Sequence, residues 1–227
     1  SSGIVTTIAG SGAYGSNDAS SNGTAASFSQ PLGITTDGTY LYVADTGCNK
    51  IRRIVIATGS VSTIAGSGSV GATDNIGVLA SFKNPAGITT DGTYLYVADT
   101  GNNKIRKIDI LTREVTQFAG AGGDYWYNDL YDNVANGTWI GGAANFHNPT
   151  GITTDGTNLY VADADNNVIV KIEISTKAVS VLAGSNAFGS SDGTGTRASF
   201  SQPVGITTDG TNLFTTEYLN SLIRRVQ

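Results

Sequence analysis

The sequence has no methionine, one cysteine and one histidine among its 227 residues. Because Cys48 is alone, no internal disulfide can form, and we expect this residue to be an incidental surface thiol. Because His147 is alone, zinc sites and the common nucleophile-base pairs of enzymes are disfavoured. Since an initiator methionine is missing, the sequence is expected to be a processed or excised product of a longer polypeptide.

Charged residues and long apolar runs are also scarce. Charged residues make up 14% of the chain and the formal net charge is -5, whereas nucleic-acid-binding proteins gather Lys and Arg on one face. Nucleic acid is therefore not an expected partner. No run approaches the ~18 apolar residues of a membrane-spanning helix, so no membrane span is expected. The abundance of Gly, Ser, Thr and Asn is typical of an exported bacterial protein that is extracellular or on the cell surface.

What the sequence does contain is one stretch in four copies. The copies begin at Pro31, Pro85, Pro149 and Pro203, and the first reads Pro-Leu-Gly-Ile-Thr-Thr-Asp-Gly-Thr-Tyr-Leu-Tyr-Val-Ala-Asp. The first and third intervals are equal, and the second is longer. Such a period indicates a repeat architecture in which each unit buries its apolar face against the next. The sequence therefore predicts a single domain over residues 1–227.

Each repeat is predicted to form four antiparallel strands, A to D. In the first repeat the strands cover 33–36, 40–44, 50–56 and 60–64, with a turn at Asp37-Gly38. Apolar residues fall on both faces of the strands, which indicates sheets buried between two neighbours. No helical period is present. The fold class is therefore predicted to be all-β, with each meander forming one blade of a four-bladed β-propeller.

A match between the two ends of the sequence predicts how the ring closes. The first three repeats include a strand D, and the fourth does not. Residues 4–10 match 61–66 almost residue for residue. We therefore expect an N-terminal strand over residues 3–10 to complete the last blade, which would leave no free sheet edge.

Three motifs resemble the NHL repeat over essentially the whole chain. They are Pro-x-Gly-Ile-x-x-Asp-x-x-x-Leu-Tyr-Val-Ala-Asp, Asn-x-x-Ile-Arg-x-Ile and Val-x-x-x-Ala-Gly. The resemblance implies a β-propeller used mostly as an interaction platform, with a minority of relatives that are metal-dependent hydrolases or lyases. This sequence departs from the family by having four repeats where six blades are usual. Its fourth copy also departs, with Thr215-Thr216-Glu217 in place of Val-Ala-Asp.

The crossover before the third repeat is the first candidate site. It runs from Gly120 to Pro149, is longer than the other three crossovers, and holds both tryptophans. Long loops on a rigid scaffold commonly bind ligands, and aromatic rings beside carboxylates and amides can stack on a sugar while bonding its hydroxyls. The alternative is a small local core that holds the insertion in place. The predicted ligand-binding residues are Tyr125, Trp126, Tyr127, Tyr131 and Trp139.

The acids that end strand B are the second candidate site. If they converge near the channel, they could hold a calcium ion, which prefers oxygen ligands. The alternative is that they are turn residues paired with the Arg residues of strand C, a pairing that Val170 breaks in the third repeat. An ion bound by the A strands, at Thr35, Thr36 and their equivalents, is a third candidate by analogy only. The four acids are Asp45, Asp99, Asp163 and Glu217.

These observations favour a non-enzymatic extracellular module that binds a protein or a glycan through its loops. One alternative is a calcium-dependent hydrolase or lyase that uses the four acids. The other is a structural subunit of a surface assembly, in which the domain associates with copies of itself.

Overall fold

The computed structural model describes residues 3–122 and 139–227, and it is built from strands joined by short turns. This confirms the all-β prediction. Blade 1 comprises β1 (Pro31–Thr36), β2 (Tyr40–Asp45), β3 (Lys50–Val55) and β4 (Val61–Ala65). Blade 2 comprises β6 (Pro85–Thr90), β7 (Tyr94–Asp99), β8 (Lys104–Asp109) and β9 (Glu114–Ala119), with the short β5 (Asn75–Ile76) outside β9.

The remaining strands form two more blades. Blade 3 comprises β11 (Pro149–Thr154), β12 (Asn158–Asp163), β13 (Val168–Glu173) and β14 (Ala178–Ala183), with β10 (Trp139–Ile140) outside β14. Blade 4 comprises β15 (Pro203–Thr208), β16 (Leu213–Glu217) and β17 (Leu222–Val226). The 3-10 turns are η1 (Gly23–Ala25), η2 (Thr46–Cys48), η3 (Gly77–Leu79), η4 (Thr100–Asn102), η5 (Gly141–Ala143) and η6 (Gly195–Arg197).

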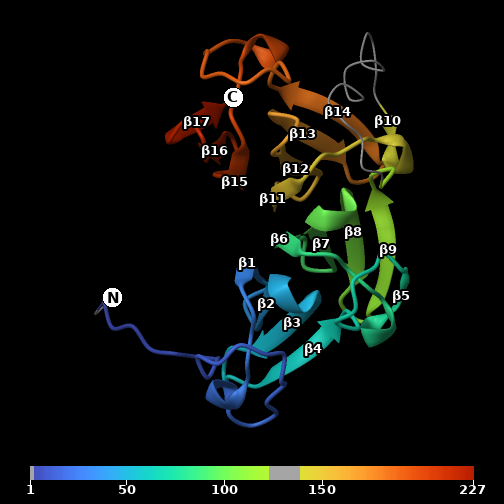
Figure 1. Ribbon diagram of the computed structural model, residues 1–227, viewed down its shortest axis with the longest axis vertical. Coiled ribbons are helices and arrows are strands. Elements are labelled where there is room, and N and C mark those ends of the chain that lie inside the picture. The colour runs from blue at the N-terminus through green and yellow to red at the C-terminus, as the bar shows by residue number, and fades with distance from the viewer. Residues whose placement is uncertain (1–2, 123–138) are drawn as a thin grey trace.

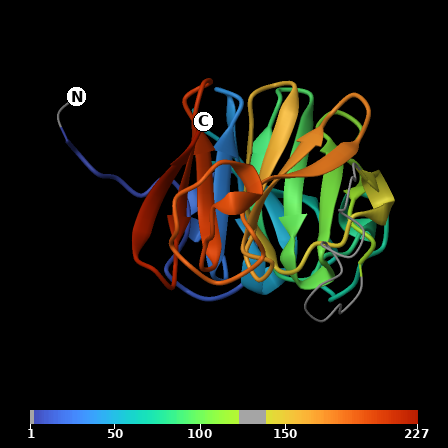
Figure 2. The ribbon, with the colours of Figure 1, turned by 90° about the horizontal axis from the view of Figure 1, so that it is seen from above.

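The blades follow one another around a central axis, as the propeller prediction requires (Figure 1). Their strands run along the axis, side by side around the molecule (Figure 2). The innermost strands pack in series, β1 on β6, β6 on β11 and β11 on β15. Among the described residues, no comparable contact joins β15 back to β1. The arrangement is therefore an open arc of four blades.

Close approach of the innermost strands explains the glycine in the Pro-x-Gly-Ile motif. A Cβ atom on Gly33 would overlap the carbonyl oxygen of Ala86, and one on Gly87 would overlap that of Thr150. Gly151 stands in the same relation to Val204 in the next blade. Only a residue without a side chain lets two backbones approach this closely. The motif is thus required for packing between blades as well as for strand formation.

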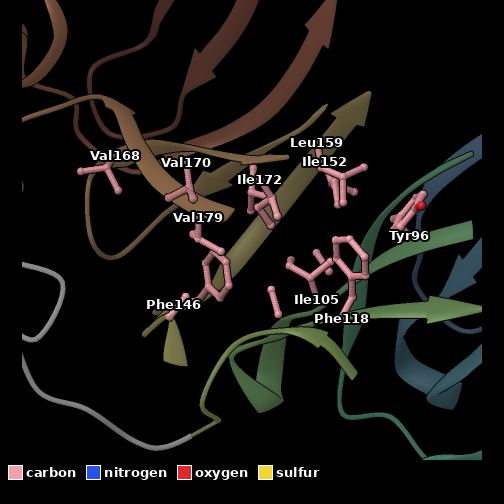
Figure 3. Packing of buried hydrophobic residues seen from close by; sticks show 14 residues of the cluster. Tyr96, Ile105, Phe118, Phe146, Ile152, Leu159, Val168, Val170, Ile172 and Val179 are labelled. Carbon is pink, nitrogen blue, oxygen red and sulfur yellow. The ribbon is translucent and has the colours of Figure 1, made fainter. Parts of the chain in front are cut away.

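The apolar core lies between consecutive blades. One cluster joins blade 2, through Tyr96, Ile105 and Phe118, to blade 3, through Phe146 and Ile172 (Figure 3). Equivalent clusters lie between blades 1 and 2 and between blades 3 and 4. The phenylalanines that end the second and fourth crossovers, Phe82 and Phe200, are buried in these clusters, whereas Phe28 at the end of the first crossover is partly buried.

The predicted N-terminal closing strand is not formed. Residues 3–10 contain no strand, and the sheet of blade 4 consists of β15, β16 and β17. The backbone N–H groups of Gly10 and Ser11 donate to carbonyls of the crossover into blade 1, at 2.9 and 2.8 Å. These bonds fix the segment beside blade 1, and its free end projects outward from the body of the molecule (Figure 1). The sequence match was correct, but the segment lies beside the wrong blade to close the ring.

In the described part of the chain, no helix is long and apolar enough to span a membrane.

Candidate functional site

The turns between strands B and C lie on the same face as the crossovers, and we call this face the loop face. In blade 1 the Gly47 N–H donates to the Ser29 carbonyl at 2.9 Å. In blade 2 the Asn102 side-chain amide donates to the Gly71 carbonyl at 2.7 Å. Each bond joins a turn to the crossover that enters the same blade. In blades 1 and 2 the turns and the crossovers of the loop face are therefore held together by hydrogen bonds.

The long crossover returns to blade 3 in the same way as the shorter ones return to their blades. Trp139 and Ile140 form β10, which pairs with β14 opposite Val179, just as β5 pairs with β9. The Gly120 N–H donates to the Gly141 carbonyl at 3.1 Å, the counterpart of the bond from Gly66 to Gly77. The extra residues are therefore inserted between two anchored points. Four of the predicted ligand-binding residues lie outside the described residues, namely Tyr125, Trp126, Tyr127 and Tyr131.

A polar pocket of about 220 Å³ lies where the insertion leaves blade 2. Lys83, Lys104 and Asn102 line it, together with Gly101 and Gly122. Ammonium and amide groups donate hydrogen bonds to hydroxyl and carboxylate oxygens. The sequence analysis missed this pocket because its residues come from a crossover, a turn and a strand. The one signal was that Lys83 replaces the serine found in the first and fourth copies.

The four acids that end strand B do not converge; each is buried and bonded within its own blade. Asp45 accepts from the Ser29 N–H at 2.7 Å and from the Arg52 guanidinium at 2.7 Å. Asp99 is paired with Arg106 at 2.9 Å, and Glu217 with Arg224 at 2.6 Å. The predicted structural pairing with strand C is confirmed.

The saturation of these carboxylates corrects the calcium hypothesis. The residues described, which include all four acids, contain no group of three or more metal-ligating side chains. In Asp45, Asp99 and Glu217 one carboxylate oxygen accepts from a guanidinium and the other from a backbone N–H, so neither oxygen is free to bind a shared ion. The calcium-dependent hydrolase that depended on Asp45, Asp99, Asp163 and Glu217 as one site therefore has no geometric basis in these residues.

The strand C arginines have a second partner that the sequence analysis did not identify. Arg52 also bonds Asp18 at 2.8 Å, Arg106 bonds Asp74 and Arg224 bonds Asp192, and each of these acids lies in the incoming crossover. Arg52 donates to the Asn17 and Ser27 carbonyls as well. Its guanidinium lies 4.9 Å from the centre of the Phe28 ring. Each arginine thus clamps a crossover to its blade.

Blade 3 lacks this clamp, because Val170 stands where the other blades have arginine. Val170 is buried in the cluster that also contains Phe146 (Figure 3). Asp163 is fully buried, and among residues 3–122 and 139–227 its donors are neutral: the His147 N–H and the Asn166 amide, both at 2.8 Å. Burial without a guanidinium raises the pKa of Asp163 to about 8. At neutral pH this carboxyl group is mainly protonated.

The aspartates of the Asp-Gly turns have a structural role at the opposite end of the blades. Asp155 accepts from the backbone N–H groups of Thr157 and Asn158, at 2.8 and 2.6 Å, and from the Tyr160 hydroxyl. Partial burial acts to raise the pKa of Asp155, but these hydrogen bonds outweigh it and lower the pKa to about 2. Asp37, Asp91 and Asp209 make the equivalent backbone bonds.

The single cysteine and the single histidine lie on the loop face. The Cys48 thiol donates to the Gly15 carbonyl at 3.1 Å, and burial, with the nearby Asp45, raises its pKa. A raised pKa disfavours the reactive thiolate. His147 lies 3.8 Å from the Asp165 carboxylate through its Nε2 atom. Neither residue has the partner that activates a nucleophile in the common catalytic pairs.

Comparisons with known proteins give relatives along most of the chain. The family described as the LVIVD repeat matches residues 86–110. NHL repeat-containing protein 2 of Homo sapiens is 32% identical over 172 residues, which cover 69% of this chain and 22% of that protein. The Arabidopsis thaliana protein SUPPRESSOR OF QUENCHING 1, chloroplastic, is 29% identical over 234 residues, covering 98% of this chain and 22% of that protein. The chain thus spans about a fifth of the length of these relatives.

Solved structures show the same fold. A structure described as an auxiliary nutrient binding protein from Bacteroides ovatus superposes with a TM-score of 0.68 at 15% identity. The superposition covers 94% of this chain and 55% of that one.

Proposed function

The chain belongs to the NHL-repeat propellers, and on that premise we propose that it is a non-enzymatic binding module that recognises a glycan outside the cell. The observation that carries this proposal is the insertion after Gly122, beside a pocket lined by Lys83 and Lys104. A rigid repeat scaffold that departs from its own period in one loop is typical of a binding protein.

The chemistry of the insertion suits a sugar. Its aromatic residues can stack on the apolar face of a pyranose ring, and its Asp and Asn side chains can bond the hydroxyls. The pocket lysines add donors for hydroxyl or carboxylate oxygens. A structure with the same fold is described as nutrient binding, which supports a binding role. The buried Arg–Asp pairs, which hold the acids in structural bonds, support the same conclusion.

A glycan array tests the proposal. The wild type should bind a defined set of glycans, and the double variant Trp126→Ala, Trp139→Ala should lose at least tenfold in signal, because stacking contributes about 1 kcal/mol or more per ring. Tyr14→Ala is the matched control, since Tyr14 is an exposed aromatic residue on a crossover that has no insertion. Undiminished binding by the double variant would show that the insertion is not the site. If neither the wild type nor any variant binds a glycan on the array, the ligand should instead be a protein.

A further inference from the structure

Blade 4 contains a position for a strand that none of the described residues fills. In blade 2 the outer strand β9 lies between β8 and the crossover strand β5. Blade 3 has the same order, with β14 between β13 and β10. In blade 4 a groove of about 400 Å³ occupies this position, lined by Gly193 and Thr194 of the crossover and by Arg224 and Val226 of β17. The groove has the boundaries of an outer strand.

A hydrogen-bond acceptor for that strand is already in place. The Oδ2 atom of Asp18 accepts from the Thr63 N–H in β4 at 3.0 Å, and that of Asp74 accepts from the Gln117 N–H in β9 at 2.9 Å. Asp192 is their counterpart in blade 4 and bonds Arg224 in the same way. Its side chain is 96% exposed, compared with 48% for Asp18. Asp18 is covered in part by its neighbouring outer strand, and the greater exposure of Asp192 is expected where that strand is missing.

Residues 4–10 have the sequence of an outer strand but no blade to join. When Gly10 is aligned with Gly66, Thr7 coincides with Thr63 and Val5 with Val61. Val61 is buried, whereas Val5 is 94% exposed. The segment is held at its end by the bonds of Gly10 and Ser11 to the crossover into blade 1. Ala9 packs against blade 1, but Ile4 and Val5 are largely exposed, so the outer part of the segment is not buried against any sheet of the described residues.

The two ends of the arc expose the two halves of an interface between blades. Ile223 of blade 4 is 78% exposed, whereas the equivalent Ile51 of blade 1 is fully buried against blade 2. Ile34 of blade 1 is 61% exposed, whereas the equivalent Ile88 of blade 2 is 5% exposed. Blades 1 and 4 border the opening of the arc (Figure 1). The exposed faces of blades 1 and 4 therefore carry the same apolar residues that are buried between blades elsewhere in the molecule.

We propose that two copies of this chain close one ring, and that residues 4–10 of each copy add to β17 of its partner as the outer strand of blade 4. Closure by a second copy keeps the three blade-to-blade interfaces as they are. Closure within one copy would have to change all three, because they leave blades 1 and 4 apart. The two-fold arrangement pairs both free edges and covers both exposed faces. The proposal does not depend on the glycan-binding function.

Sedimentation over a concentration series tests the association. The wild type should have twice the mass of the chain, and Thr7→Pro should be monomeric, because proline removes the N–H that would donate to Asp192. Thr7 lies outside the described strands, so the variant should fold. Leu111→Asp is the control: it replaces an exposed apolar residue in a turn of blade 2 and should stay dimeric. A monomeric wild type, or a dimeric Thr7→Pro variant, would overturn the proposal.

Disulfide trapping then distinguishes a second copy from closure within one chain. In β3 and β4, Arg53 is paired with Ser62, and the equivalent pair in the proposed dimer is Arg225 with Thr6. In a Cys48→Ser background, Thr6→Cys and Arg225→Cys are placed in separate chains and mixed under oxidising conditions. The mixture should give a covalent dimer that neither chain forms alone. No cross-link in the mixture, or a monomeric cross-link when one dilute chain carries both cysteines, would contradict the two-copy ring.

Discussion

Replacing Asp163 by asparagine should remove a pH dependence of stability that the wild type has. Asp163 is buried in blade 3 without the arginine that accompanies the other three acids, and its pKa is raised to about 8 from 3.8. The unfolded chain loses this proton near its ordinary pKa, whereas the folded chain keeps it until about pH 8. Between these values the unfolded state binds fewer protons, so stability must fall as the pH rises.

The size of the effect follows from the shift. Each unit of pKa difference corresponds to about 1.4 kcal/mol, so the full shift from 3.8 to about 8 is worth up to about 6 kcal/mol. This contribution is fully present below about pH 4, is lost at about 1.4 kcal/mol per pH unit up to about pH 8, and is constant above that. A loss of this size is a large part of the roughly 5–15 kcal/mol that stabilises a typical domain.

Urea unfolding between pH 5 and 9 measures the slope directly. The free energy of unfolding of Asp163→Asn, minus that of the wild type, should rise by about 1.4 kcal/mol per pH unit up to about pH 8. If the asparagine amide loses a hydrogen bond, the free energy of unfolding of the variant falls by the same amount at every pH, and the slope of the difference is unchanged. Asp155→Asn is the control in the same blade, because its pKa of about 2 confines its titration to lower pH. Parallel curves for Asp163→Asn and the wild type would refute the reasoning.

Three other predictions follow from packing and charge. Gly87→Ala should lower the free energy of unfolding by more than about 3 kcal/mol, measured in urea, because the added Cβ would overlap backbone atoms. Gly205→Ala should lower it much less, because there the added Cβ meets a side-chain hydroxyl at 2.9 Å. Equal losses in the two variants would contradict the packing argument. Arg106→Leu should lower the free energy of unfolding by about 3–5 kcal/mol, because the buried Asp99 carboxylate would lose its guanidinium partner. Arg197→Leu is the control and should lower it by about 0.5 kcal/mol or less, because Arg197 is exposed. Cys48 should react slowly with a thiol reagent at pH 7 and faster in urea; equal rates would contradict its raised pKa.

The architecture was predictable from the sequence because repeats provide their own comparison. Four copies of one motif fixed the strands, their turns and the blade boundaries, and the recurring Arg and Asp positions indicated the ion pairs. What repeats in the sequence must repeat in the packing, because each blade contacts only its neighbours.

The placement of residues 4–10 was not predictable, because the sequence match identifies the type of strand without saying which blade it meets. The angle between blades decides that, and it is set by contacts such as that of Gly33 with the Ala86 carbonyl. The polar pocket at Lys83 and Lys104 was missed because three separate segments form it. The second acid of each clamp, such as Asp18, was missed because crossovers carry no strand pattern to align.

The two departures of blade 3 from the repeat have one physical origin. Elsewhere the strand C arginine fixes the crossover by bonding two of its carbonyls and its aspartate, as Arg52 does with Asn17, Ser27 and Asp18. A crossover lengthened by insertion need not present these groups in the same places, and an arginine without them would be a buried charge lacking its partners. Valine at position 170 avoids that cost, while β10 still pairs with β14 as β5 pairs with β9 in blade 2. Asp163 is then left without a guanidinium partner in blade 3, and burial raises its pKa. Replacing the insertion by a short crossover should therefore stabilise the domain only when Val170→Arg is introduced with it.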